Sequence, residues 1–230
     1  MKIRFSACRM WLRRFFFSFF LISITSALIL RFVPPPLTPL MVIRGIQGMS
    51  EGRGFVIRKQ WQPLERISPL LIQAVIASED QKFPNHFGFD LQAISKAYSN
   101  NLIGKRQKGA STISQQTAKN VFLWPTSSYL RKAIEVYFTL LIESVWSKER
   151  IIEVYLNVAE FGPGVYGAEQ AAQMYFHKSA LGLTSREAAM LAAILPAPRR
   201  WDAAHPTTYL LQRRRWIMQQ MRNVGPIDLN

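Results

Sequence analysis

Two acidic sites flank a polar segment in the middle of this chain. Glu79 lies in EDQKFPNHFG and Glu135 in RKAIE, and the segment GASTISQQTAKN lies between them. That segment supplies hydroxyls, amides and the cation Lys119. Chemistry on a sugar diphosphate needs this combination, because a carboxylate must take a proton from a weakly nucleophilic hydroxyl while cations neutralise the departing phosphate. The sequence therefore predicts an enzyme.

The elements that must position these residues are predicted to be helices. Ser68 can cap a helix that starts with Pro69, and Leu71, Val75 and Glu79 follow at i+4 spacing. Glu79 thus falls on an apolar stripe near a helix end, where partial desolvation favours its neutral form and makes it a better base. Further helices are predicted at residues 91–102, 114–122, 129–146, 148–157, 168–176, 185–195 and 209–222. The predicted fold class is mainly α.

Four stretches resemble the motifs of a known family. In order and spacing, EDQKFPNHFG, GASTISQQTAKN, RKAIE and KERIIEVYLN are similar to the motifs of the monofunctional biosynthetic peptidoglycan transglycosylases, relatives of the glycosyltransferase domain of class A penicillin-binding proteins. The resemblance extends from about Gln62 to Met221. It implies a lysozyme-like helical domain that polymerises lipid II, the undecaprenyl-diphosphate-linked disaccharide-pentapeptide, into β-1,4 glycan strands of the cell wall.

The resemblance implies roles for the two carboxylates. Glu79 would be the general base that deprotonates the 4-hydroxyl of the acceptor sugar, with inversion at the donor, which is the lipid-linked growing strand. Glu135 would position the donor's diphosphate directly or through a divalent cation, Mg²⁺ or Mn²⁺, and no organic cofactor is implied. The sequence leaves simpler alternatives open, namely ion pairs of Glu79 with Lys82 at i+3 and of Glu135 with Arg131 at i,i+4.

Substrate-binding residues are expected in the second and third motifs. Lys119 matches the family lysine that contacts the diphosphate, and Arg131 and Lys132 would face the same group. A solvated surface lysine is the alternative for Lys119. Many relatives carry an arginine where this chain has Ser127, so the other cations would carry more of the diphosphate binding. The expected hydrogen-bond donors are Ser111, Thr112, Gln115 and Gln116.

Other motif residues are interpreted as structural. Asp80 is expected to orient Lys82 or to cap the following turn, while His86 and Gly88 shape the loop. Gly109 would permit a tight turn before the second-motif helix. The fourth-motif residues expected to support the cleft are Glu153, Tyr155 and Asn157.

The N-terminus predicts one transmembrane helix. Residues 1–14 carry five cations and no acid, and residues 15–33 are almost wholly apolar. As a helix, the second segment would span roughly 28 Å, close to the ~30 Å hydrocarbon core of a bilayer. The positive-inside rule keeps the basic segment in the cytoplasm and exports the rest across the inner membrane. A cleaved signal peptide is the alternative, although Thr25-Ser26-Ala27 is a poor cleavage site and the apolar run continues past it.

The remaining sequence divides into a linker and a catalytic domain. Residues 34–61 form a proline-led linker and membrane-proximal segment, and residues 41–62 are predicted to be a few short extended segments because they alternate loosely and contain several glycines. Residues 62–230 are the predicted glycosyltransferase domain. The single cysteine, Cys8, falls on the cytoplasmic side, so no disulfide is expected outside.

Charge and composition narrow the choice of function. The chain has a net charge of +15, and the part beyond residue 33 keeps 23 cations against 14 acids, a net charge of +9. This excess would attract a diphosphate and anionic lipid headgroups. The same charge is typical of nucleic-acid binding, but an export anchor argues against that partner.

Two rival functions remain. A lysozyme-like hydrolase also uses two carboxylates across a sugar cleft, but it does not need cations around Glu135. A non-catalytic anchor that recruits other cell wall synthesis or division proteins would not need complete acidic motifs. The chain lacks S-x-x-K and K-T-G, which indicates that it has no transpeptidase activity, and its three histidines lack metal-like spacing.

Overall fold

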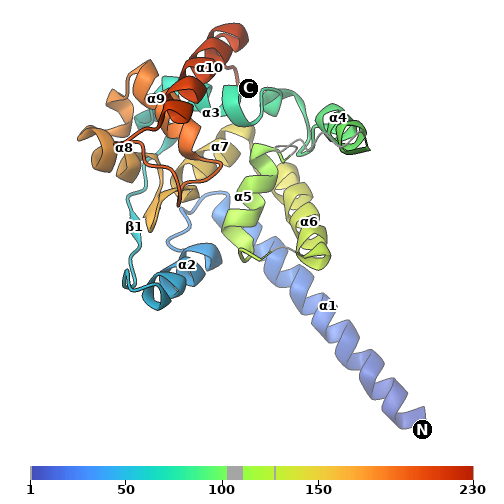
Figure 1. The fold of residues 1–230 in the computed structure, drawn as a ribbon. Helices are drawn as coiled ribbons and strands as arrows, with labels where there is room; N and C mark the ends of the chain where they lie inside the picture. The colour runs from blue at the N-terminus through green and yellow to red at the C-terminus, as the bar shows by residue number, and fades with distance from the viewer. Residues whose placement is uncertain (1, 103–110, 127, 230) are drawn as a thin grey trace. The chain divides into compact units, whose positions relative to one another are not determined.

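A computed structural model describes residues 2–102, 111–126 and 128–229, which form two compact units, Met1–Pro34 and Pro35–Asn230. The first unit contains one unbroken helix, α1 (Lys2–Leu30), within which Arg9–Leu30 is long and apolar enough to cross a membrane (Figure 1). Many of its apolar side chains are exposed, Phe17 to 70%. The predicted anchor, residues 15–33, overlaps this helix but extends past its end, because the chain turns before the three prolines.

The second unit contains every other helix that the sequence predicts, with small shifts at the helix ends. Polar caps fix these ends: Thr112 caps α5, Ser128 caps α6 and Ser147 caps α7. The helices are α3 (Pro69–Glu79), α4 (Leu91–Leu102), α5 (Ile113–Phe122), α6 (Tyr129–Val145), α7 (Lys148–Val158), α8 (Ala168–Phe176), α9 (Ser185–Ile194) and α10 (Thr208–Val224). Three short 3₁₀ turns connect them at Leu64–Arg66, Phe83–Asn85 and Ala180–Gly182.

The prediction for residues 41–62 is wrong, because their first part is helical. Helix α2 (Pro39–Ser50) forms since Thr38 caps its first turn and Pro39 occupies the first helical position. Its glycines reflect close packing, since a Cβ on Gly45 would lie 2.6 Å from the ring of Phe55. The extended structure in this segment is confined to strand β1 (Arg58–Lys59).

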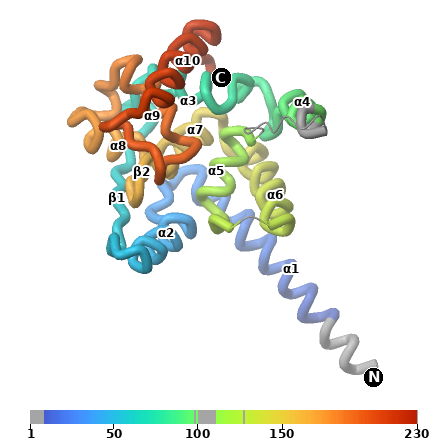
Figure 2. The backbone as a smooth tube through the Cα atoms, in the orientation of Figure 1, coloured from blue at the N-terminus to red at the C-terminus, as the bar shows by residue number. Residues whose placement is uncertain are grey.

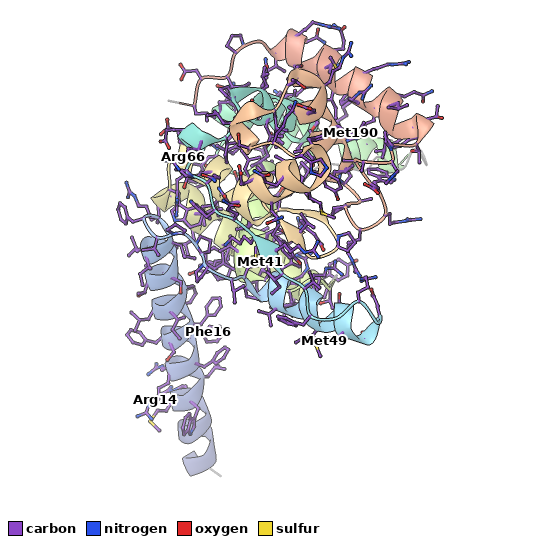
Figure 3. All side chains as sticks on the ribbon, turned by 90° about the vertical axis from the view of Figure 1, so that its left-hand side faces the viewer. Arg14, Phe16, Met41, Met49, Arg66 and Met190 are labelled. Atoms are coloured by element: carbon purple, nitrogen blue, oxygen red, sulfur yellow. The ribbon has the colours of Figure 1, made fainter. Side chains whose placement is uncertain are left out.

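The core forms around two groups of three helices. Helices α3, α9 and α10 pack together, and α5 packs on α6 and α7 (Figure 2). Fully buried alanines such as Ala189 and Ala192 on α9 allow α3 and α10 to approach closely. Helix α2 also packs on α5; its Met41 is completely buried, whereas Met49 is 58% exposed (Figure 3). This packing places the end of α3 beside α5 and α10.

A small sheet completes the second unit. Strand β3 (Val165–Tyr166) pairs in parallel with β1 and antiparallel with β2 (Glu160–Gly162). The stretch GPGVYG therefore belongs to a hairpin. Gly164 in its turn has φ +73°, and a Cβ there would lie 2.6 Å from the carbonyl oxygen of Val56, so only glycine fits.

Candidate active site

Glu79 is the last residue of α3, and its side chain is only 12% exposed. Gln116 Nε2 of α5 donates a 3.0 Å hydrogen bond to Glu79 Oε2, and Arg213 of α10 lies 3.8 Å from Oε1. Burial raises the pKa of Glu79, and these neighbours oppose that effect only in part. Lys82 lies 3.9 Å from Asp90 instead, so the ion pair considered for Glu79 does not form.

A buried tyrosine orients the amide that binds Glu79. Tyr155 of α7 is 1% exposed, and its hydroxyl donates to Gln116 Oε1 at 3.3 Å. Burial raises the pKa of Tyr155 well above its usual value, so the hydroxyl stays protonated. With its Oε1 engaged, Gln116 presents its NH₂ group to the carboxylate. The interpretation of Tyr155 as mainly structural does not include this link, which joins residues from three different helices.

Asp80 joins α3 to α5. Its carboxylate is buried, both oxygens lie 3.0 Å from His86 Nε2, and Oδ2 accepts a 2.9 Å hydrogen bond from the Ile113 N–H. It therefore satisfies one of the free N–H groups at the start of α5. The predicted contact between Asp80 and Lys82 does not form, and Asp80 caps α5 instead of the turn that follows it.

Glu135 lies in the first half of α6 and is 3% exposed. Arg131 donates to its Oε2 at 2.6 Å, and Lys132 contacts its Oε1. The ion pair with Arg131 considered as an alternative is therefore present, and both carboxylate oxygens are engaged. Arg131 Nε is buried without a hydrogen-bond partner in the described part of the chain. Glu135 thus holds two cations side by side.

Lys119 of α5 is half-buried, in contrast to a solvated surface lysine. Burial lowers its pKa, while the charges of Glu135 and Glu79 oppose that shift and those of Arg131 and Lys132 add to it. Its ammonium group makes no hydrogen bond or ion pair with the residues that the structure describes. A partly desolvated cation without a partner, in the field of both carboxylates, favours binding of a multiply charged anion.

The four predicted donors have different surroundings. Thr112 and Gln115 form a capping box at the start of α5, so their polar atoms bind the chain itself. Gln116 binds Glu79, whereas Ser111 is exposed and lines the same hollow as Glu79. Contacts of Ser111, Thr112 and Gln115 with substrate stay predictions.

Glu79 lines one hollow, and its hydrogen-bond partner Gln116 lines another. The first, of about 380 Å³, has Glu79 in its wall together with Ser111, Lys82 and Trp216. The second, of about 240 Å³, has Gln116, Lys119, Asn120 and Tyr155 on its polar side. The buried carboxylate therefore faces one hollow and the unpaired cation faces the other, which suits two substrates that react with each other.

Two fourth-motif residues bind the segment that precedes α3, and their predicted support of the cleft stays a prediction. The side chain of Asn157 exchanges two 2.8 Å hydrogen bonds with the backbone of Gln62, and Glu153 accepts a hydrogen bond from the same segment. The predictions about Gly109 and Ser127 fall outside the described residues.

The described residues do not form a preformed metal centre. No group of three or more His, Cys, Asp or Glu side chains within that part of the chain is placed to hold a metal ion. Glu135, the expected ligand, already has both oxygens engaged by cations. The described side chains thus offer no preformed cluster of this kind, and a divalent cation in the site stays a prediction.

Comparison with known proteins covers nearly the whole chain. Residues 49–222 match the family model described as transglycosylase. A protein of Bdellovibrio bacteriovorus named biosynthetic peptidoglycan transglycosylase is 51% identical over 227 residues, which is 98% of this chain and 90% of that protein. Proteins with the same name are 50% identical in Shewanella oneidensis (219 residues, 95% of this chain and 93% of that protein) and 52% identical in Xanthomonas campestris (204 residues, 88% and 83%).

Proposed function

The chain belongs to the transglycosylase family, and from this premise we propose how its site builds the glycan strands of peptidoglycan. The protein is a peptidoglycan glycosyltransferase of cell wall synthesis. Lipid II is the acceptor in this proposal, and the lipid-linked growing strand is the donor. The acceptor sugar occupies the Glu79 hollow, and the donor's diphosphate lies at Lys119.

In the proposed reaction, Glu79 takes the proton of the acceptor's 4-hydroxyl as that oxygen attacks the donor's anomeric carbon. The new C–O bond forms while the bond from that carbon to the diphosphate oxygen breaks, so the lipid diphosphate leaves with the electron pair and the centre is inverted. Lys119, Arg131 and Lys132 neutralise the charge that develops on the leaving group. Glu135 keeps Arg131 and Lys132 in place. A divalent cation, if one takes part, would be held mainly by the diphosphate.

One observation carries this proposal: Lys119 has no partner in the described part of the chain, yet it lies in the field of both Glu79 and Glu135. A glycoside hydrolase places two carboxylates across its cleft but has no phosphate leaving group to neutralise. The unpaired cation beside the buried base therefore favours a transferase over a hydrolase.

The setting of the enzyme is the second part of the proposal. Helix α1 supports a single-pass anchor, and its basic start supports a cytoplasmic N-terminus with the catalytic domain outside the inner membrane. Both substrates carry a lipid, so a membrane anchor keeps the enzyme where they are. We further propose a monofunctional enzyme without transpeptidase activity, whose protein partners would be other cell wall synthesis or division proteins.

The test is the purified full-length protein incubated separately with lipid II and with purified glycan strands. The proposal predicts long strands and released lipid diphosphate from lipid II, while the purified strands stay uncut. Fragments released from the strands, with no polymer from lipid II, would show a hydrolase.

A further inference from the structure

A third hollow, here called the arginine pocket, lies beyond the Lys119 hollow. It has a volume of about 160 Å³ and lies between α2, β1 and the turn from β2 to β3. The two hollows share Arg44 and Glu160 in their walls, so they are neighbours. Four arginines line the arginine pocket: Arg44, Arg53, Arg58 and Arg199.

Close backbone packing builds the walls of this pocket. A Cβ on Gly48 would lie 2.8 Å from the carbonyl oxygen of Gly54, and one on Gly164 would lie 2.6 Å from that of Val56. Side chains larger than hydrogen are therefore excluded at two points of the wall. The backbone is therefore closely packed at these two points.

The guanidinium groups around the pocket are only partly satisfied. Arg44 Nε is buried without a hydrogen-bond partner among the described residues, and it lies 3.9 Å from Glu160 Oε2, too far for a hydrogen bond. Arg58 is exposed, and its side chain makes no hydrogen bond or ion pair within the same set of residues, so its donors are open to a ligand. Arg53 and Arg199 both bind Glu51 at the rim. Four arginines against two carboxylates leave an excess of positive charge and free N–H donors.

We propose that the arginine pocket binds a carboxylate of a peptide stem on the growing strand. This inference rests on the proposed function, in which the donor's diphosphate lies at Lys119, in the hollow that shares Arg44 and Glu160 with the arginine pocket. Each disaccharide unit carries a pentapeptide, which ends in a carboxylate. Arginine binds planar carboxylates through paired N–H donors, and the pocket has room for a carboxylate. The pocket would hold the strand in place between additions.

The experiment compares the lengths of the strands made by three proteins: the wild type, Arg58→Gln and the double variant Arg58→Gln/Arg199→Gln. Each protein is given two precursors, lipid II and lipid II whose stem carboxylates are amidated. The matched control is Arg66→Gln, an exposed arginine outside the pocket. With lipid II, the double variant should make strands roughly three- to tenfold shorter, the scale of one lost hydrogen bond. The single variant should fall between the double variant and the wild type.

With amidated lipid II, the wild type itself should make short strands, and the variants should shorten them no further. Equal strand lengths for all proteins on lipid II, or the same loss on the amidated precursor, would overturn the inference.

Repeating the assay in vesicles with and without anionic lipid, and with added inorganic phosphate, separates the stem from other anions. A loss seen only with anionic lipid would assign the pocket to a headgroup. A wild type that makes no polymer from either precursor would overturn the proposed function as well, and thermal unfolding of each variant checks that it is folded.

Discussion

Glu79 and Glu135 are two carboxylates of one site with little exposure to solvent, and their surroundings are opposite. Glu135 is 3% exposed and has a cation on each oxygen. Glu79 has one amide hydrogen bond and an arginine at 3.8 Å, and burial raises its pKa. A carboxylate whose oxygens both bind cations is a poor base. A carboxylate whose negative charge is offset by few neighbours is stabilised when it takes a proton. The number of cations and donors around each carboxylate, more than its burial, therefore distinguishes Glu79, the base, from Glu135, which positions cations.

Glu79→Gln removes the proposed base of the pair and should have the largest effect on activity. The substitution keeps the shape and the hydrogen bond from Gln116 but removes the base, so polymerisation of lipid II should fall by about 10²- to 10⁴-fold. The measurement is glycan product on gels, with Glu149→Gln, an exposed acid on α7, as the matched control. Near-normal product from a folded Glu79→Gln protein would remove Glu79 from the role of base.

Lys119→Ala tests the cation between the two carboxylates. Use of the donor should fall by about 10²-fold, as when a preorganised group that stabilises developing charge is removed. Unchanged rate and apparent affinity would show that Lys119 does not bind the diphosphate. Ser127→Arg, which restores the cation that many relatives carry, should leave activity unchanged or raise it in the same assay.

The stability of the two Gln variants should change in opposite directions. Glu135→Gln leaves Arg131 without its charge partner, so the free energy of unfolding should fall by about 1–3 kcal/mol, less than is typical of a broken buried pair because Lys132 is 45% exposed. Glu79 has a raised folded-state pKa, so its stabilising contribution is complete below the unfolded-state pKa and is lost as pH rises through the folded value. Glu79→Gln should therefore stabilise the protein at neutral pH but not in acid. Urea unfolding at neutral and at acid pH measures the free energy of unfolding of each variant. Equal changes in that free energy for Glu79→Gln and Glu135→Gln would contradict the comparison.

Tyr155→Phe should have the smallest effect. It removes the hydrogen bond that fixes the amide of Gln116, so the carboxylate of Glu79 loses part of its support. Activity at neutral pH should fall roughly three- to tenfold. The pKa of the acid limb of the pH–rate profile should rise as well, whereas a purely structural defect would lower the rate equally at every pH.

The sequence predicts local structure in this protein better than it predicts contacts. Helix starts such as that of α5 could be predicted because Thr112 and Gln115 carry a local capping pattern. Helix α2 could not, since the glycines that suggest extended chain are required by packing against a later segment, as Gly45 shows against Phe55. The glutamates and Lys119 were found because motifs mark them.

The support around Glu79 could not be predicted from spacing. Tyr155 and Arg213 reach the site from α7 and α10, and no periodic pattern links either residue to Glu79. The same holds for Asp80, whose side chain binds the backbone of Ile113 instead of the nearby Lys82. Such long-range contacts depend on how helices pack, which local propensity does not specify.

The measurement that tests the central claim most directly is the pH dependence of lipid II polymerisation by the wild-type enzyme at subsaturating substrate. The acid limb of that profile reports the essential base of the free enzyme. If Glu79 is the weakly compensated base, activity should appear as pH rises through an apparent pKa above the ordinary glutamate value of 4.5. An acid limb at or below that value would show a base whose charge is well compensated and would contradict the account.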